Sequence, residues 1–479
     1  MESSANAVDL PLAVDLDGTL VNTDLLVESM FCSLSHNPLG FIRALIGLGA
    51  GVATAKKNLA LLSADLAPEN LPFNADLVEY LRSEKARGRE IALVSASNHQ
   101  LVSQVANHLE LFDWHQGSTP DNNLKGELKA RFLTERYPDG FVYAGDSAAD
   151  VAVWRKAKGA IAVSVSSRVD GALRELTSRS PLEKRFDFTP PTLATWAKAL
   201  RLHQWIKNAL ILIPLFLSGL FMDAGYVAQV SLGVLAFGLI ASGGYLFNDL
   251  LDLQADRVHP SKRHRPLAAG LIGPFSAMAV CAGSIASGLL VMSVLSIQAG
   301  LLALAYLAGT LTYSVWIKRL ALVDLVALGG LFTVRVAIGT SLINASYSTW
   351  LLTFSMFFFF SLSAVKRVAE LMRVGSGARR GYLPADLGLL QNLGVSMSTA
   401  ALVIFVLYLE NEALVQGNYP NPQWLWLAPL AVFVWLCRLW LMAVRGVLHD
   451  DPVVFALKDP VSMTIGAVLG FSVLAAHLL

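Results

Sequence analysis

Residues 245–270 read YLFNDLLDLQADRVHPSKRHRPLAAG, and this stretch decides how the second half of the chain is interpreted. Four polar side chains in it share one helix face, because they recur at spacings of three, four and seven residues. They are Asn248, Asp249, Asp252 and Asp256. Stacked carboxylates repel each other unless a cation neutralises them, and hard oxygen ligands suit Mg²⁺ that carries a diphosphate. The basic residues that follow are suited to hold phosphate oxygens. They are Lys262, Arg263 and Arg265. The alternative is an interfacial loop whose charges only anchor the helix.

Nine apolar runs, each long enough to cross ~30 Å of hydrocarbon as a helix, surround this stretch. They cover about residues 205–222, 227–248, 271–294, 297–316, 320–343, 349–366, 389–409, 424–444 and 460–478. Lys and Arg gather in the loops after the second, fourth, sixth and eighth runs, and the alternate loops contain none. Since such an excess marks the cytoplasmic side, we expect a multi-pass domain with its N-terminal segment in the cytoplasm and its C-terminus outside.

The composition separates two halves of the chain. Overall, 54% of the residues are hydrophobic and 15% are charged, whereas soluble domains have roughly 45–50% and 25%. Residues 1–191 carry 19 Lys and Arg against 24 Asp and Glu, a net charge of −5; residues 192–479 carry 18 against 12, a net charge of +6. The first half has the composition of an acidic soluble domain. The second is apolar and basic, which favours a lipid bilayer as its surroundings and excludes a nucleic-acid-binding module.

The string DLDGTL at residues 15–20 follows a short apolar run that reads as a buried strand. Asp15 ends this strand, Asp17 comes two residues later, and Gly18 allows a turn. The first carboxylate is placed to attack phosphorus, and the second to protonate the leaving oxygen and take the proton back. The alternative is a strand-end turn without chemistry.

Three further segments carry groups suited to a phosphate ester. A strand over residues 90–95 ends at Ser95 and precedes a helix, whose N-terminus is a natural phosphate site. Lys125 and Lys129 lie at the start of another helix. A strand over residues 141–145 is followed by Asp146 and Asp150, which suit Mg²⁺ or, alternatively, cap a helix.

These four segments, in this order, resemble the haloacid dehalogenase-like phosphatases over about residues 8–180. The resemblance implies an α/β domain of Rossmann-like architecture over residues 1–185, with a helical cap at about 24–70. A degenerate domain that is kept only as a scaffold is the alternative.

The same resemblance implies a role for each polar residue. Asp15 would be the nucleophile and Asp17 the general acid and base. Ser95 and a lysine would hold the phosphate, and Lys129 is favoured over Lys125. The implied Mg²⁺ ligands are Asp15, Asp17, Asp146 and Asp150.

Further polar residues lie at or inside the apolar runs. Arg335 lies within the fifth run, and an intramembrane arginine by default faces a polar cavity, although a structural salt bridge is the alternative. Lys207, with Asn208, precedes the body of the first run and is suited either to donor phosphates or to anchoring the helix. The remaining substrate-binding candidates are Tyr313, Lys318, Asp324 and Lys366.

The second half resembles the UbiA superfamily of intramembrane prenyltransferases over about residues 195–479, through its nine runs and the NDxxDxxxD pattern of residues 248–256. Aromatic prenyltransferases of this superfamily usually carry a second motif of DxxxD type. This chain has YSxxIKRxxxxD instead, with the single Asp324. Together with QWxKN at residues 204–208 and Arg335, that pattern resembles the decaprenyl-phosphate phosphoribosyltransferase branch.

This resemblance implies an all-α, UbiA-like transferase domain over residues 196–479 in a membrane of the bacterial inner-membrane type, after a linker at 186–195. Mg²⁺ would be held by Asn248, Asp249, Asp252 and Asp256, with Asp249 and Asp252 catalytic. The donor would be phosphoribosyl diphosphate and the acceptor a polyprenyl phosphate. The fused phosphatase would remove the 5-phosphate to give a polyprenyl-phosphate pentose for envelope glycan synthesis. The alternative is a prenyl diphosphate donor with an aromatic or other small acceptor, beside an independent phosphatase.

Overall fold

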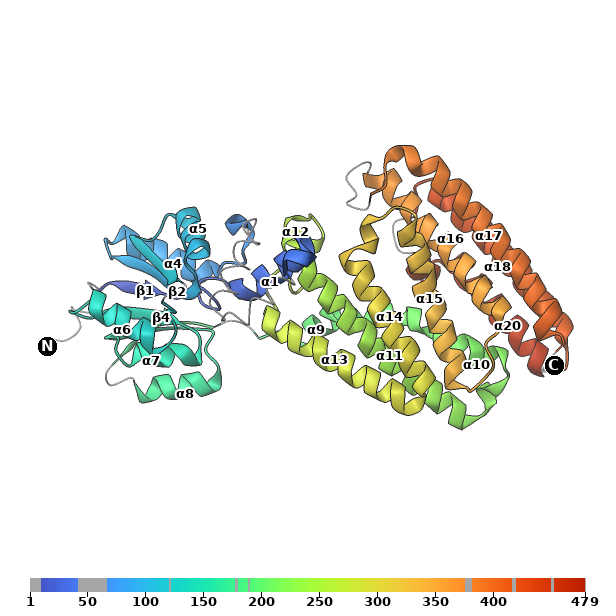
Figure 1. Ribbon diagram of the computed structural model, residues 1–479, viewed down its shortest axis with the longest axis horizontal. Helices are drawn as coiled ribbons and strands as arrows, with labels where there is room; N and C mark the ends of the chain where they lie inside the picture. Colours follow the sequence, from blue (N-terminus) through green and yellow to red (C-terminus); the bar gives the residue numbers. More distant parts are fainter. Residues whose placement is uncertain are drawn as a thin grey trace. The chain divides into compact units, whose positions relative to one another are not determined.

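The computed structural model describes residues 10–41, 67–119, 122–176, 180–187, 190–374, 381–415, 419–448 and 452–478. Most of the expected cap insertion, residues 42–66, and the acidic pair Asp450 and Asp451 lie outside these described residues. The chain divides into two compact units: residues 1–200 with 246–280 form the first, and residues 201–245 with 281–479 form the second (Figure 1). The acidic segment 248–256 therefore belongs to the same unit as the N-terminal α/β fold.

A wholly parallel six-stranded sheet forms the centre of the first unit, in the order β3-β2-β1-β4-β5-β6. The strands are β1 (Leu12–Val14), β2 (Ile91–Asn98), β3 (Trp114–Ser118), β4 (Val142–Gly145), β5 (Gly159–Val163) and β6 (Leu182–Phe186). Leu12 pairs with Ile91 on one side and with Val142 on the other. The strand order reverses between β1 and β4, and ligands bind outside the carboxyl ends of the strands at such a point. The predicted α/β architecture is confirmed.

Helices cover both faces of this sheet (Figure 1). One face packs against α4 (Ala75–Ala86) and α5 (His99–Leu109), through an apolar core that includes Leu81 and Val102. The other packs against α6 (Glu127–Arg136), α7 (Val151–Trp154) and α8 (Ser167–Glu175), where Leu133 and Trp154 are fully buried. The described parts of the expected cap contain α1 (Leu25–His36) and the 3₁₀ turn η2 (Pro68–Asn70). Helix α1 is capped by Asp24, whose side chain accepts a hydrogen bond from the Val27 amide.

Among the described residues, eight helices are long and apolar enough to cross a membrane. They are α11 (Ala224–Leu251), α13 (Pro274–Leu295), α14 (Ile297–Val315), α15 (Val323–Leu342), α16 (Thr349–Val374), α17 (Leu387–Tyr408), α18 (Leu427–Val444) and α20 (Pro460–Leu478). Helices α14 to α17 each pack against the next along the chain, and α18 packs against α20. The protein is therefore a multi-pass membrane protein, as predicted.

The first of the nine predicted runs, residues 205–222, does not form a long helix. Its residues lie in a 3₁₀ helix, η4 (Leu202–Leu212), a short α-helix, α10 (Ile213–Leu217), and a 3₁₀ turn, η5 (Leu220–Met222). Pro214 has no amide hydrogen and is tolerated only in the first turn of a helix, and Gly219 has a positive φ of 75°. The expectation of nine long spans is corrected to eight in the described parts of the chain, because the apolar helix formed here, Leu202–Leu217, ends before Gly219 and is shorter than the roughly 20 residues that a span needs.

Candidate functional site

The phosphatase motif begins where β1 ends, at Asp15. Its amide donates to the carbonyl oxygen of Ala144 at 3.0 Å, which ties the residue to β4, and its Oδ1 accepts from the Leu16 amide at 2.8 Å. Gly18 has φ +76°, and a Cβ at this position would lie 2.4 Å from Oδ2 of Asp146. The turn thus needs glycine both for its backbone and for the close approach of a carboxylate.

Lys129, at the start of α6, lies against the nucleophile position. Its Nζ is 2.9 Å from Oδ2 of Asp15 and 3.7 Å from Oδ1 of Asp150, and it donates to the Tyr143 hydroxyl at 2.8 Å. Burial lowers the pKa of the Lys129 ammonium, but the two carboxylates outweigh burial, so the pKa is raised and the cation persists. Lys125 is exposed, and the geometry therefore favours Lys129 as the lysine of the site.

Asp17 is held in a different set of contacts from Asp15. Its Oδ1 accepts from the Leu25 amide at 2.8 Å, and its Oδ2 accepts from the hydroxyls of Ser97 and, at 3.4 Å, Ser95. Burial, reinforced by the negative charge of Asp24, raises the pKa of Asp17 to about 6. A carboxyl group with a raised pKa can give a proton to a leaving oxygen near neutral pH.

Asp15, Asp146 and Asp150 form the one carboxylate cluster in the described residues with oxygens suited to hold a metal ion, all within 4.8 Å of one another. Burial raises the pKa of Asp15 to about 7, against the opposing effect of Lys129, and raises that of Asp146 to about 8. Three oxygens from carboxylates are the donor set that Mg²⁺ prefers. The predicted ligand Asp17 is not in this cluster, because its oxygens face Leu25 and Ser97.

Three residues of this site are absent from the sequence-based prediction. Ser97 bonds to Asp17, Thr19 donates to Oδ1 of Asp146 at 3.1 Å, and the Tyr143 hydroxyl donates to Oδ1 of Asp150 at 2.7 Å. The position of Ser97, two residues after Ser95 on one strand, was a usable signal, because alternate residues share a face. Tyr143 reads as core in the sequence, so only its tertiary contacts reveal its role.

The acidic segment continues from α11 into α12 (Leu253–Val258), with Asp252 at the junction. The Asp252 amide bonds to the Asn248 carbonyl oxygen at 3.0 Å, and the Asp256 amide to that of Asp252 at 2.8 Å, so the helical hydrogen-bond pattern continues through the junction. The Asn248 amide group donates to Oδ2 of Asp252 at 3.1 Å. Asp249 and Asp256 are buried. The side chains of this face supply amide and carboxylate oxygens of the kind that Mg²⁺ binds.

Arg265 lies between two of these carboxylates. Its Nη1 is 3.0 Å from Oδ1 of Asp249 and 2.5 Å from Oδ2 of Asp256. Lys262, in the 3₁₀ turn η6 (Lys262–His264), lies 3.5 Å from Oδ1 of Asp256. Arg263 is exposed and its Nε faces His264. Two of the three predicted bases therefore lie on the acidic segment, and the third lies away from it.

A separate polar cluster lies in the second unit, around Asp324 on α15. Oδ2 of Asp324 accepts from Nε of Arg367 at 2.7 Å, and Oδ1 accepts from the Tyr382 hydroxyl. Arg367 on α16 also donates to the Tyr313 hydroxyl at 3.2 Å and to Glu370 at 2.7 Å. Asp324 and Arg367 are both almost fully buried, so this pair lies in the interior of the second unit.

Arg335 is buried on α15 among aromatic rings. Its guanidinium lies 5.1, 4.8 and 5.0 Å from the ring centroids of Phe237, Tyr306 and Phe332, and it donates to the Tyr306 hydroxyl at 3.0 Å. Nε of Arg335 is buried and, among the described residues, has no hydrogen-bond partner. Lys207 on η4 lies 5.9 Å from the centroid of the same Phe332 ring. Two predicted cations thus lie close to the same phenyl ring.

The other predicted residues of the second unit are less closely grouped. Asn208 is buried next to Lys207 in the chain, and its amide nitrogen is also buried without a partner among the described residues. Lys318, in the 3₁₀ turn η7 (Ile317–Arg319), and Lys366, on α16, are half-buried.

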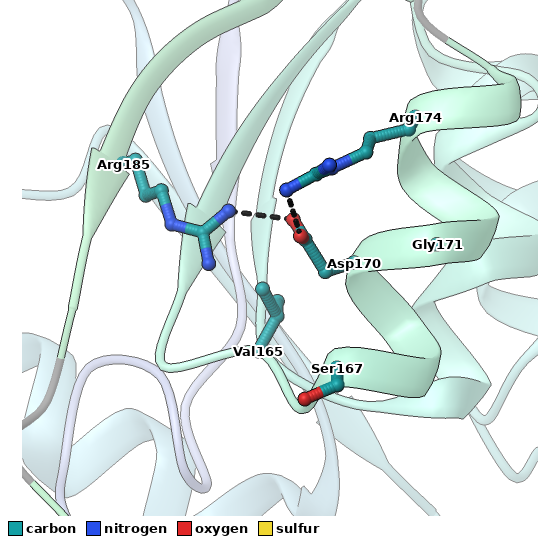
Figure 2. Close-up of a pocket in the computed structure, with 6 residues that line it drawn as sticks. All are labelled: Val165, Ser167, Asp170, Gly171, Arg174 and Arg185. Atoms are coloured by element: carbon teal, nitrogen blue, oxygen red, sulfur yellow. Dashed lines mark hydrogen bonds and ion pairs between the residues drawn. The ribbon is translucent and has the colours of Figure 1, made fainter.

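A hollow of about 370 Å³ lies on the surface of the α/β fold, between α8 and β6 (Figure 2). Its charged groups are paired within the hollow: Asp170 lies 2.8 Å from Arg174 and 2.5 Å from Arg185. The other lining residues are Val165, Ser167 and Gly171. The hollow contains none of the phosphatase motif residues, and we assign it no function.

Comparisons with known proteins give two family matches along the chain. The model of the UbiA prenyltransferase family matches residues 211–456, and that of the haloacid dehalogenase-like hydrolases matches residues 12–155. A Sinorhizobium fredii protein named "Uncharacterized protein y4nM" is 40% identical over 469 residues, which cover 96% of this chain and 90% of that protein.

Two further relatives match the second half. Nodulation protein NoeC of Azorhizobium caulinodans is 32% identical over 288 residues, which cover 58% of this chain and 92% of that protein. Decaprenyl-phosphate phosphoribosyltransferase of Mycolicibacterium smegmatis is 30% identical over 295 residues, which cover 57% of this chain and 92% of that protein. The chain belongs to the UbiA prenyltransferase family and carries an N-terminal haloacid dehalogenase-like domain.

Proposed function

We propose that the membrane domain transfers phosphoribose from phosphoribosyl diphosphate to a polyprenyl phosphate, and that the N-terminal domain then removes the 5-phosphate. In the first step a phosphate oxygen of the lipid bonds to C1 of the ribose, and the bond from C1 to diphosphate breaks. In the second step the phosphate ester is hydrolysed, which leaves a polyprenyl-phosphate pentose and inorganic phosphate. Such a lipid is a furanose donor for envelope glycans.

The observation that carries the choice of acceptor is the environment of Arg335. Its side chain is buried in a membrane-spanning helix, and no carboxylate in the described residues lies within ion-pair distance of it. A buried cation without a counter-charge is costly. A polyprenyl phosphate would supply an anion at this depth, with its apolar chain in the bilayer, whereas a neutral aromatic acceptor would not. The unpartnered Nε adds a free donor for a phosphate oxygen.

The donor is proposed from two further features. The similarity to a decaprenyl-phosphate phosphoribosyltransferase covers nearly all of that protein. In addition, the single Asp324 is engaged by Arg367 and Tyr382, so this segment offers no second acidic cluster for a diphosphate. We assign Asp249 and Asp252 as catalytic, and Lys262 and Arg265 as bases that hold the leaving diphosphate.

Mg²⁺, when bound by the acidic segment or by Asp15, Asp146 and Asp150, would offset the charge on the phosphate oxygens. In the phosphatase domain, Oδ2 of Asp15 attacks phosphorus while Asp17 protonates the leaving 5-oxygen. Water then hydrolyses the aspartyl phosphate, and Asp17 accepts the proton. Lys129 and Ser95 orient the phosphate.

We further propose that the phosphatase domain, residues 1–185 with their linker 186–195, lies on the cytoplasmic side of a plasma membrane of the bacterial inner-membrane type. The Lys and Arg residues in alternate loops support this orientation. The same loops support a C-terminus outside, and the proposed cytoplasmic position of the phosphatase domain requires that residues 202–222 cross the bilayer.

The test incubates the purified full chain with labelled phosphoribosyl diphosphate, decaprenyl phosphate and Mg²⁺, and separates the lipid products by chromatography and mass spectrometry. We expect a lipid-linked pentose from the wild type and a lipid-linked pentose phosphate from Asp15→Asn. Asp170→Asn, in the surface hollow, is the control and should behave as the wild type. A parallel incubation supplies a prenyl diphosphate and an aromatic acceptor instead. If product forms only in that incubation, the proposal is wrong.

A further inference from the structure

A buried glutamate in the first unit takes no part in either reaction described above. Glu28, on α1, is 2% exposed, and Asp and Glu are almost never buried to this degree unless they are paired. Its partner is Arg257, on α12, 229 positions later in the chain: Nη1 lies 2.8 Å from Oε2 and Nη2 lies 2.5 Å from Oε1. This two-pronged geometry defines position and orientation together.

Each carboxylate oxygen of Glu28 also accepts a second hydrogen bond. The Thr23 hydroxyl donates to Oε1 and the Gln254 amide donates to Oε2, both at 2.5 Å. Apolar contacts flank the pair, because Phe31 on α1 meets Phe247 edge-on, with ring centroids 6.0 Å apart. The contact between α1 and the segment around α12 is therefore closely packed as well as charged.

Both ends of this contact lead directly to a proposed site. At one end, the first amide of α1, that of Leu25, donates to Oδ1 of Asp17, and Glu28 lies one helical turn further on. At the other end, Arg257 follows Asp256, which pairs with Arg265. A shift of α12 on donor binding would thus displace Glu28. Because Glu28 lies on α1, the hydrogen bond from the Leu25 amide to Asp17 would change in length as well.

We propose that Glu28 is a positioning residue that couples the two sites: occupation of the acidic segment by a diphosphate donor changes the turnover of the phosphatase site through α12 and α1. This inference rests on the proposed function for the assignment of the two sites. Coupling between sites is a measurable free energy. The ion pair itself is not stabilising enough to explain its burial, because desolvation of two charges offsets much of their attraction.

The experiment measures hydrolysis of p-nitrophenyl phosphate by the full chain in detergent with Mg²⁺, with and without a saturating donor. Phosphoribosyl diphosphate and geranylgeranyl diphosphate are tested separately. We expect the donor to change kcat/KM of the wild type by at least about fivefold, the lower end of typical coupling. In Glu28→Gln the ratio of rates with and without donor should approach one.

Glu84→Gln is the matched control, because Glu84 is 3% exposed in the same unit and pairs with Arg89 at 2.9 Å, away from α12. It should lose thermal stability but keep the donor response. Gln254→Met removes one contact to Glu28 without unpairing a charge, and it should weaken the response if Glu28→Gln does not fold.

Two results would overturn the coupling: a response that persists in Glu28→Gln and Gln254→Met, or a wild type that transfers pentose to lipid yet responds to neither donor. Failure of the proposed function looks different. In that case the response and the lipid transfer would both appear with geranylgeranyl diphosphate and not with phosphoribosyl diphosphate.

Discussion

Replacement of Gly18 by alanine separates backbone strain from damage to the phosphatase site. Gly18 has φ +76°, a conformation that costs a residue with a side chain about 1–2 kcal/mol. For a domain of this size, that cost corresponds to a fall in unfolding temperature of roughly 2–8 °C. The added methyl group would also lie 2.4 Å from Oδ2 of Asp146, where ordinary contacts are at 3.4 Å or more.

The contact between the added methyl group and Asp146, rather than the backbone strain, determines the effect on activity. Asp146 must move by about 1 Å to admit the methyl group, and a displacement of that size at a catalytic group costs on the order of 10²-fold in rate. We therefore expect Gly18→Ala to lower kcat/KM for p-nitrophenyl phosphate about a hundredfold, measured with Mg²⁺ on the full chain.

Gly88 offers a matched control within the same fold. It has φ +86°, and an added Cβ would meet nothing within 4 Å. Gly88→Ala should therefore lose a similar amount of thermal stability and keep wild-type kcat/KM. The reasoning is refuted if both variants lose activity equally, or if Gly18→Ala keeps the wild-type rate.

Three further predictions address the buried charges. Lys129→Met should lower the free energy of unfolding, measured by chemical denaturation, by about 3–5 kcal/mol, because it leaves buried carboxylates without their cation. The control Lys125→Met, at an exposed position, should leave the free energy of unfolding unchanged. Arg335→Leu should raise KM for polyprenyl phosphate about 10–100-fold, which corresponds to the loss of one charged hydrogen bond. The unfolding temperature should not fall. A large loss of stability would indicate that the arginine is purely structural. Asp324→Asn should lower the free energy of unfolding by about 1.5–3 kcal/mol, because it weakens a charged hydrogen bond from Arg367 while Glu370 still pairs with that arginine. It should also slow transfer, and unchanged transfer in a destabilised variant would contradict a role of Asp324 in the transfer reaction.

The sequence was sufficient to predict the order of the phosphatase segments and their meeting place. Asp15 and Asp146 each follow an apolar strand, Ser95 lies in the second half of another, and parallel strands bring their carboxyl ends to one edge of the sheet. The strand order places β2, β1 and β4 side by side, so the three residues become neighbours. Ser97 and Tyr143 could not be chosen in the same way, because serine and tyrosine serve equally as ordinary strand residues.

The membrane half shows where reasoning from apolar length reaches its limit. Eight of the nine predicted runs form long helices, and residues 205–222 do not, since their apolar helix ends at Leu217, before the positive φ of Gly219. Hydropathy measures the affinity of a segment for lipid and contains no information about its hydrogen bonds.

The sequence by itself determined which residues are acidic, basic or apolar at helix and strand spacings, and hence the two domain types and their candidate motifs. Only the tertiary structure decided how those charges are paired: Asp324 with Arg367, 43 positions apart, and Glu28 with Arg257, 229 positions apart. The physical reason is range. Backbone periodicity acts over a few residues, whereas a buried charge selects its partner from whatever the packing of distant elements brings within about 4 Å.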